Sequence, residues 1–471
     1  MPTIESVRPA SYVPRRYASG TFPVSKDYHL RQMLYNYSNS QGRDADKSKL
    51  DTSDQVIPSF PFTNVPVYAD TVDIETLAFH NYWGCLLTPD NVAARIGTDD
   101  LRYHVWVATK RVVESGLIKL TDKEALIQAV MDQFMVELGL VLLDLCPGPL
   151  VLFVDPRLQD DSEQMVSKAK AMVAKFDEAR VRRWRIIVTL PATEDGIRAA
   201  RELINRHSIQ THLSLVSCLE HAAACIETGA GMVSMSVEPI MEWFERQGST
   251  HKGRLSQDHP GIEAIQSCAT FIHRHGLNTT LLTTDIRKWS ELKQLGGIGA
   301  TALKKDQLDE APMKPLATWY PRSDDQSPAT LRALRAAYPS HYLGSLDSNK
   351  GLFASLPADC RSLVSAVLYV RLGHMATHME TIEKAVWYEL KRRIRLETIP
   401  LEYLYRRPSS NSPTESRSAR KSNMSDKATG SSSKRSKSRS RRSSRQDEEP
   451  EQQRHNKVTV SDTMVEGVDY F

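Results

Sequence analysis

The sequence predicts an α/β protein built around a closed (β/α)8 TIM barrel, and three observations carry this prediction. Short runs rich in Val, Ile, Leu and Thr alternate with helical stretches from Pro66 onward, which is typical of a parallel sheet. Eight such runs span roughly residues 65 to 310, a length that suits this barrel. No GxGxxG motif follows the first run, so an open doubly wound sheet has less support.

Each predicted strand is a short run with few charged residues. In chain order the strands lie at 66–70 (PVYAD), 84–89 (GCLLTP), 149–154 (PLVLFV), 185–190 (RIIVTL), 211–216 (THLSLV), 231–236 (GMVSMS), 279–284 (TTLLTT) and 297–303 (GIGATAL). Helices are predicted where apolar residues recur at spacings of three and four, for example at 161–178, 194–207, 218–227 and 261–275.

Four regions are predicted along the chain. They are an irregular N-terminal arm at 1–62, the barrel at 63–311, a helical C-terminal extension at 312–405 and a disordered tail at 406–471. Residues 360–396 should form one or two helices that pack on the outside of the barrel or across one of its ends. The predicted buried face of these helices comprises Val364, Val367, Leu368, Val370, Leu372 and Met375.

The net charge of +4 is unevenly distributed along the chain. Residues 406–445 hold thirteen Lys or Arg against two acids, and residues 446–471 hold seven acids against two bases. Residues 1–405 therefore carry a net charge of −2, which argues against a basic surface for nucleic acid. No stretch reaches 18 consecutive apolar residues, so we expect no membrane segment.

The basic run KRSKSRSRRSSR begins at Lys434 and ends at Arg445. Clustered Lys and Arg are typical of nuclear localisation signals, and phosphorylation of the interleaved serines would reduce the positive charge. We expect a cytoplasmic protein, with nuclear entry through this run as an alternative. Protein partners would contact the N-terminal arm or the tail.

The six cysteines are scattered, without CxxC pairs or the spacing of zinc sites. We interpret them as reduced thiols of the core.

Several motifs occur in the order and spacing of one family. They are VYADTVDIETL at 67–77, VDPRL at 154–158, TEDGIRAA at 193–200, THLSLVS at 211–217, SVEPIMEW at 236–243 and TTDIRKWSEL at 283–292. Over residues 65–310 the chain thereby resembles the transaldolases, pentose-phosphate enzymes that transfer a dihydroxyacetone unit between sugar phosphates. The resemblance implies a barrel fold, a sugar-phosphate ligand and a lysine that forms a Schiff base with the ketose.

Thr189 occupies the position of that lysine. A hydroxyl group cannot form an imine, so ordinary transaldolase chemistry is not expected. Phe153 matches the glutamate that serves the family as acid and base with a water molecule, and Thr88 matches the asparagine of the second strand. The family's catalytic Lys, Glu and Asn are therefore all replaced.

The resemblance also assigns the ligand-binding positions. His212 and Ser214 match an Asn and a Thr of the fifth strand, and Pro239 matches an arginine that binds substrate phosphate. Asp285 replaces a serine beyond the seventh strand and would repel a phosphate. Three residues of the active end are unchanged, namely Asp70, Ser234 and Arg287, and Asp155 and Arg157 match on its flank.

The candidate catalytic residues are thus Asp70, Thr189 and His212. The candidate substrate-binding residues are Thr88, Ser214, Ser234, Asp285 and Arg287. Asp70 could transfer protons or cap the next helix. The alternative to a catalytic role for His212 is a histidine of the barrel interior whose hydrogen bonds are all satisfied.

Each charged residue near the barrel mouth has two possible roles, one in ligand binding and one in the structure. Arg287 could hold an anion or be paired in a salt bridge. Lys304 and Lys305 lie where many barrels bind phosphate, or form a surface pair. Asp70, His212 and Asp285 could converge on a metal, but we expect no metal site and no cofactor.

Three functions remain open from these residues. The first is a degenerate transaldolase-family protein with a metabolite-binding or regulatory role, whose ligand is a sugar phosphate or another small metabolite. The second is a divergent enzyme acting on another carbonyl or biosynthetic substrate without an imine, with Asp70 and His212 as acid and base. The third is a scaffold that uses the barrel and the basic tail.

Overall fold

The computed structural model describes residues 60, 63, 65–248, 259–312 and 327–398. The predicted tail and nearly all of the predicted N-terminal arm lie outside the described residues, as does the run from Lys434 to Arg445.

Eight parallel strands close into a barrel in chain order, with β1 paired to both β2 and β8. The prediction of a TIM barrel is therefore confirmed, and each strand lies within or next to its predicted run. The strands are β1 (Val67–Ala69), β2 (Gly84–Leu87), β3 (Leu150–Phe153), β4 (Ile186–Pro191), β5 (Thr211–Ser214), β6 (Met232–Ser236), β7 (Thr280–Thr284) and β8 (Ala300–Leu303).

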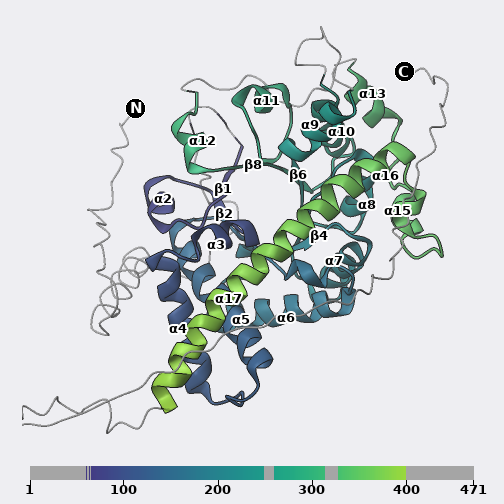
Figure 1. Ribbon diagram of the computed structural model, residues 1–471. Coiled ribbons are helices and arrows are strands. Elements are labelled where there is room, and N and C mark those ends of the chain that lie inside the picture. Colours follow the sequence, from purple (N-terminus) through teal and green to yellow (C-terminus); the bar gives the residue numbers. More distant parts are fainter. Residues whose placement is uncertain (1–59, 61–62, 64, 249–258, 313–326, 399–471) are drawn as a thin grey trace, which may run out of the picture. The chain divides into compact units, whose positions relative to one another are not determined.

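Helices surround the barrel (Figure 1). Up to β8 they are α2 (Ile74–Phe79), α3 (Pro89–Arg95), α4 (Asp99–Ser115), α5 (Lys123–Leu145), η2 (Pro156–Leu158), α6 (Ser162–Glu178), η3 (Arg183–Arg185), α7 (Glu194–His207), α8 (Leu219–Glu227), α9 (Val237–Arg246), α10 (Pro260–Arg274) and α11 (Trp289–Gln294). Beyond β8 they are α12 (Lys305–Asp309), α13 (Pro328–Arg335), α14 (Tyr342–Ser345), α15 (Gly351–Ser355), α16 (Ala358–Val364), the π-helical η5 (Ser365–Tyr369) and α17 (Val370–Thr398).

The interior of the barrel is divided into an apolar half and a polar half. Because side chains alternate along a strand, every second residue faces the interior. A buried cluster fills the half near the strand starts and contains Tyr68, Leu86, Val151, Ile187, Met232, Leu282, Ala300 and Ala302. Two residues further along the strands, polar side chains such as Asp70, Thr88 and Thr189 line a cavity instead. The apolar half therefore forms the floor of that cavity.

Helix α5 is long and apolar enough to cross a membrane, by length and composition. In the structure it is a core helix, because 67% of its apolar window is buried against the rest of the chain. It packs against α4 and α6 and against strands β2 and β3.

The C-terminal extension ends in α17, which packs on α3, α4, α5 and η2 and so lies across one end of the barrel (Figure 1). Of the predicted buried face, Val364, Val367, Leu368 and Leu372 are buried and Met375 is partly buried. Val370 was predicted wrongly, since its side chain is 54% exposed. It lies two residues from both Leu368 and Leu372, and about 200° of helical rotation places it on the opposite face.

The turn from β4 into α7 is tight at Gly196. The Thr193 side chain caps α7 by accepting a hydrogen bond from the Gly196 amide, at 3.0 Å. A Cβ on Gly196 would lie 1.8 Å from the carbonyl oxygen of Pro191. A Cβ on Gly373 of α17, by contrast, would have no neighbouring atom within 4 Å.

We predict that Gly196→Ala lowers the free energy of unfolding by about 3 kcal/mol, because the backbone of β4 must move to relieve the clash. Gly373→Ala is the matched control in a helix, and should raise the free energy of unfolding by up to about 1 kcal/mol through helix propensity. Urea unfolding followed by circular dichroism measures both. Equal effects of the two substitutions would contradict the described packing at the β4–α7 turn.

Two buried histidines predict an acid sensitivity of the fold. Burial lowers the pKa of His212 to about 3 and that of His221 to about 4. Between those values and the ordinary 6.5, the unfolded chain binds more protons than the folded one. The free energy of unfolding contributed by these groups is therefore complete above pH 6.5 and is lost as the pH falls.

We expect the double variant His212→Gln/His221→Gln to lose stability less steeply than the wild type between about pH 6 and 4. Replacing the exposed His374 by Gln should leave the slope unchanged. Urea unfolding at a series of pH values tests this, and an unaltered slope in the double variant would refute the explanation.

Candidate functional site

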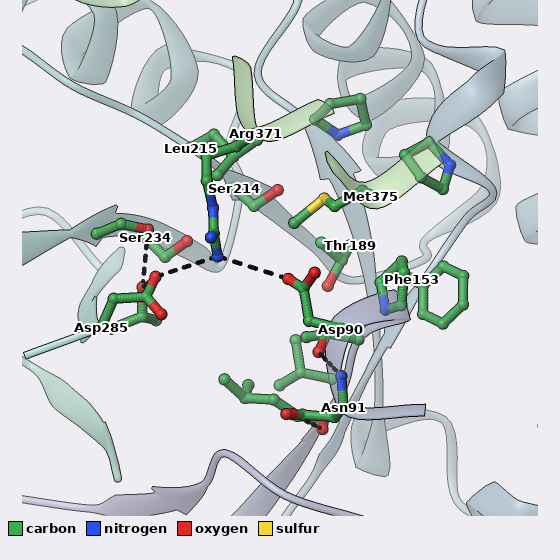
Figure 2. A pocket seen from close by; sticks show the side chains of 18 of the residues that line it. Asp90, Asn91, Phe153, Thr189, Ser214, Leu215, Ser234, Asp285, Arg371 and Met375 are labelled. Carbon is green, nitrogen blue, oxygen red and sulfur yellow. Dashed lines mark hydrogen bonds and ion pairs between the residues drawn. The ribbon is translucent and has the colours of Figure 1, made fainter. Parts of the chain in front are cut away.

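A cavity of about 290 Å³ opens at the carboxyl ends of the strands. Seven of the eight predicted catalytic and substrate-binding residues line it, namely Asp70, Thr88, Thr189, His212, Ser214, Ser234 and Asp285. Figure 2 shows Thr189, Ser214, Ser234 and Asp285 around this space. Carboxyl ends of barrel strands are where barrel enzymes hold their functional groups, so this cavity is the candidate site.

The centre of the site is a hydrogen-bonded pair on neighbouring strands. Thr189 and His212 are partners in the register of β4 and β5, and 3.0 Å separates Thr189 Oγ1 from His212 Nδ1. Burial lowers the pKa of His212 to about 3, so the imidazole is neutral near pH 7. A neutral imidazole has one donor nitrogen and one acceptor nitrogen.

The other nitrogen of His212, Nε2, is buried and has no hydrogen-bond partner among the described residues. A buried polar atom without a partner costs free energy, which a ligand that hydrogen-bonds to it recovers. Whether Nε2 donates or accepts depends on the tautomer that Thr189 selects. A ligand hydroxyl group satisfies both cases, because it can donate and accept.

Asp70 follows β1 and is held by a residue that the sequence did not point to. The Asn91 amide donates to Asp70 Oδ1 at 2.8 Å and to the carbonyl oxygen of Leu86 at 3.3 Å. Burial raises the pKa of Asp70, and the charge of Asp285 adds to the rise, whereas the Asn91 hydrogen bond opposes it. Asp70 does not cap the next helix, since Asp73 is the residue that precedes α2.

The other residues at the strand ends differ in their hydrogen-bond partners and polarity. The Thr88 hydroxyl caps α3 by accepting a hydrogen bond from the backbone N–H of Asn91, at 3.2 Å. Ser214 donates to the carbonyl oxygen of Leu190 at 3.3 Å, and Ser234 is buried. Phe153 lines the cavity with an aromatic side chain, which offers no acid or base.

Arg371 of α17 closes one side of the site. Its Nη2 lies 3.5 Å from Asp90 Oδ2 and 3.6 Å from Asp285 Oδ2, and Figure 2 shows the guanidinium between the two carboxylates. His378, about two helical turns further along α17, hydrogen-bonds to the other carboxylate oxygen of Asp90. The extension thus contributes Arg371, which bridges α3 and the residue after β7, and His378, which contacts α3.

Two backbone positions at the mouth are strained. Leu215 has a φ of 67° and Asp285 a φ of 49°, in the left-handed region that residues other than glycine rarely adopt. Both residues line the cavity. Strained residues concentrate at functional sites, which agrees with a ligand-binding role for this mouth.

Arg287 is the predicted site residue that does not line the cavity. It donates from Nε to Glu291 at 2.8 Å and from its terminal nitrogens to Glu245 at 3.2 and 3.0 Å. Of the two roles expected for Arg287, anion binding or a salt bridge, the structure shows the salt bridge. Pro239 is likewise absent from the lining and lies in the first turn of α9, whereas its neighbour Glu238 lines the cavity.

Arg157 helps to hold α17 over the barrel. Its guanidinium makes three hydrogen bonds to Asp155, and Nη1 donates to Glu383 of α17 at 2.7 Å. This arrangement ties η2 to the extension on the flank of the cavity.

The charged residues that line the cavity are mostly acidic. The acids are Asp70, Asp90, Glu238 and Asp285, and the bases are Lys304 and Arg371. Asp70, His212 and Asp285 all line the cavity, but within the described part of the chain they do not form a group close enough to share one metal ion.

Sequence reasoning missed Asp90, Asn91, Arg371 and His378. Asn91 stands three residues after Thr88, one helical turn beyond a strand end, and this spacing could have identified it. Arg371 and His378 stand seven residues apart on one helix, but no sequence pattern placed that helix across the mouth.

Known proteins resemble this barrel in sequence. Residues 107–337 match the model of the transaldolase/fructose-6-phosphate aldolase family. A transaldolase of Allorhizobium ampelinum is 28% identical over 244 residues, which are 52% of this chain and 74% of that protein. A transaldolase of Kluyveromyces lactis is 26% identical over 53% of this chain and 72% of its own length.

Among solved structures, a mandelate oxidase aligns with 51% of this chain and 64% of its own, at 15% identity and a TM-score of 0.24, which is too low to inform function. The sequence matches and the closed eight-stranded barrel agree with one another. The barrel of this chain is related to the transaldolase/fructose-6-phosphate aldolase family.

Proposed function

We propose that this protein binds a small, uncharged, polyhydroxylated metabolite in the barrel mouth without forming a Schiff base. It would thus be a degenerate relative of the transaldolases of pentose-phosphate metabolism, with a metabolite-binding or regulatory role. The observation that carries the proposal is the hydrogen-bonded pair of Thr189 and His212. By the sequence resemblance, Thr189 of this pair takes the place of the family's lysine.

The pair supports binding but not imine chemistry. Imine formation requires a primary amine, and the Thr189 hydroxyl is instead engaged with His212. Phe153 supplies no proton-transfer group on the neighbouring strand. Thr189, His212, Ser214 and Ser234 together offer neutral hydrogen-bonding groups around one space, which suits hydroxyl groups of a ligand.

Charge disfavours a phosphorylated ligand. The cavity has four carboxylates and two cationic side chains in its lining, and one of the cations, Arg371, already bridges Asp90 and Asp285. A phosphate dianion would meet net repulsion in this partly enclosed space. The cavity volume of about 290 Å³ is also at the lower end for ligand sites, which favours a small ligand.

A specific observation favours a second candidate function. Lys304 lines the cavity directly after β8, and its positive charge opposes the rise in the pKa of Asp70. A lysine beside a carboxyl group could form the imine from another strand, with Asp70 as the acid and base. The protein would then be an active enzyme on a carbonyl substrate.

Borohydride trapping separates the two functions. We expect no covalent adduct, by intact-mass spectrometry, when the wild-type protein is reduced with dihydroxyacetone or fructose 6-phosphate. Thr189→Lys should form an adduct with dihydroxyacetone, because it places an amine where the family has one. A bacterial transaldolase serves as the positive control.

A stoichiometric adduct of the wild-type protein would overturn the proposal. If that adduct disappeared in Lys304→Arg and persisted in Lys305→Arg, the second function would replace the first. Lys305 is the matched control because it is the adjacent lysine and does not line the cavity.

Asp285→Ser should increase the affinity for fructose 6-phosphate by about tenfold, because it removes a negative charge and releases Arg371 from one partner. Asp306→Ser, at an exposed aspartate outside the cavity lining, should leave the affinity unchanged. Isothermal titration calorimetry measures both variants. Tight binding of fructose 6-phosphate by the wild-type protein would contradict the charge argument.

A further inference from the structure

Two cysteines and a glutamate from distant parts of the sequence meet outside the barrel mouth. Cys218 is the residue before α8, Glu220 lies in the first turn of α8, and Cys360 belongs to α16. Their ligand atoms all lie within 4.8 Å of one another. Cys360 Sγ is 3.0 Å from Glu220 Oε2.

We propose that Cys218, Glu220 and Cys360 bind one zinc ion. Thiolate sulfur is a preferred ligand of zinc, and a carboxylate oxygen is an accepted partner in mixed sites. The two thiols are buried and the glutamate is partly buried, so the three groups form a recess with a soft, anionic lining.

The distances suit a tetrahedral ion after small movements. Zinc–sulfur bonds of about 2.3 Å and zinc–oxygen bonds of about 2.1 Å imply ligand separations of roughly 3.4 to 3.8 Å. The separations here reach at most 4.8 Å and the Cys360–Glu220 contact is 3.0 Å. Side-chain rotations that move each atom by about an ångström would therefore complete the site.

Electrostatics explain how the ion would be held. Both thiols are buried, and Cys360 Sγ donates a hydrogen bond to Glu220 Oε2, so the Cys360 thiol carries its proton when no ion is present. On binding, each thiol releases its proton to solvent, and two thiolates and one carboxylate leave a net charge of −1 around Zn²⁺. Cys218 stands at the N-cap of α8, where the positive end of the helix dipole favours the thiolate.

Three protein ligands leave the fourth tetrahedral position for water. The ion would also join two parts of the fold. Cys218 and Glu220 belong to the barrel, whereas Cys360 belongs to α16, which continues through η5 into α17. Zinc would thus fix α16, which leads into the helix that carries Arg371, to the barrel.

This inference does not depend on the proposed function, and metal binding tests it directly. Full-length protein is purified with a reductant, stripped with a chelator and titrated with Zn²⁺ in competition with a chromogenic chelator. We expect one ion per chain, and with Co²⁺ a sulfur-to-cobalt charge-transfer absorption in the near ultraviolet. The affinity should rise with pH, because binding displaces two protons.

Cys360→Ser should weaken Zn²⁺ binding at least a hundredfold and abolish the charge-transfer absorption of that sulfur, while keeping a hydrogen bond to Glu220. Glu220→Gln should weaken binding about tenfold and serves as a second variant if Cys360→Ser does not fold. Cys225→Ser is the matched control, because Cys225 is a buried cysteine of α8 outside the group, and it should bind like the wild type.

Three results would overturn the inference. The first is the absence of stoichiometric zinc binding, and the second is binding that survives Cys360→Ser and Glu220→Gln unchanged. The third is a Cys218–Cys360 disulfide in freshly purified protein, detected by peptide mapping without reductant, since a disulfide has no thiolate to offer.

Discussion

The structure depends on the closure of β1 against β8, because this pairing turns eight separate strands into one barrel. The helical crossovers between consecutive strands give every strand the same direction, and closure then brings all carboxyl ends to one rim. The two-residue period of each strand then decides which side chains enter the interior. Tyr68 therefore belongs to the apolar floor, while Asp70, two residues later, reaches the cavity.

Within that frame, Thr189 and Phe153, which the sequence resemblance aligns with the family's lysine and glutamate, keep the packing of the barrel. Thr189 fills its place with a hydroxyl that pairs with His212, and Phe153 extends the apolar wall. Neither change disturbs the strand register, which continues through Phe153, Thr189 and His212 on β3, β4 and β5. The barrel requires only the alternation and volume of these side chains, so its packing is compatible with different chemical groups at these positions.

The C-terminal extension reshapes the electrostatics of the site from outside the barrel. Arg371 lies between Asp90 and Asp285, and Arg157 connects η2 to Glu383 of the same helix. These ion pairs lie at the mouth and on the flank of the cavity and are partly shielded from water. Such pairs contribute little net stability, so their main effect is to orient α17 on the barrel. Asp285, which looks unfavourable for a phosphate when considered alone, has a partner in Arg371.

The sequence by itself determined the barrel, because eight short apolar runs and the intervening helical periodicity are local signals. It also determined which side chains stand at strand ends, and seven of the eight predicted residues do line one cavity. Arg287 differs because its position after β7 is compatible with both a cavity and the salt bridge to Glu245 and Glu291.

Only the tertiary structure decided the contacts between distant segments. Asp90 meets Arg371 and His378, and Glu220 meets Cys360, across 281, 288 and 140 positions of sequence. No local pattern encodes such a pairing, because it depends on where the extension packs after the barrel has closed. Scattered cysteines and an ordinary amphipathic helix became a candidate metal site and one wall of the cavity for this physical reason.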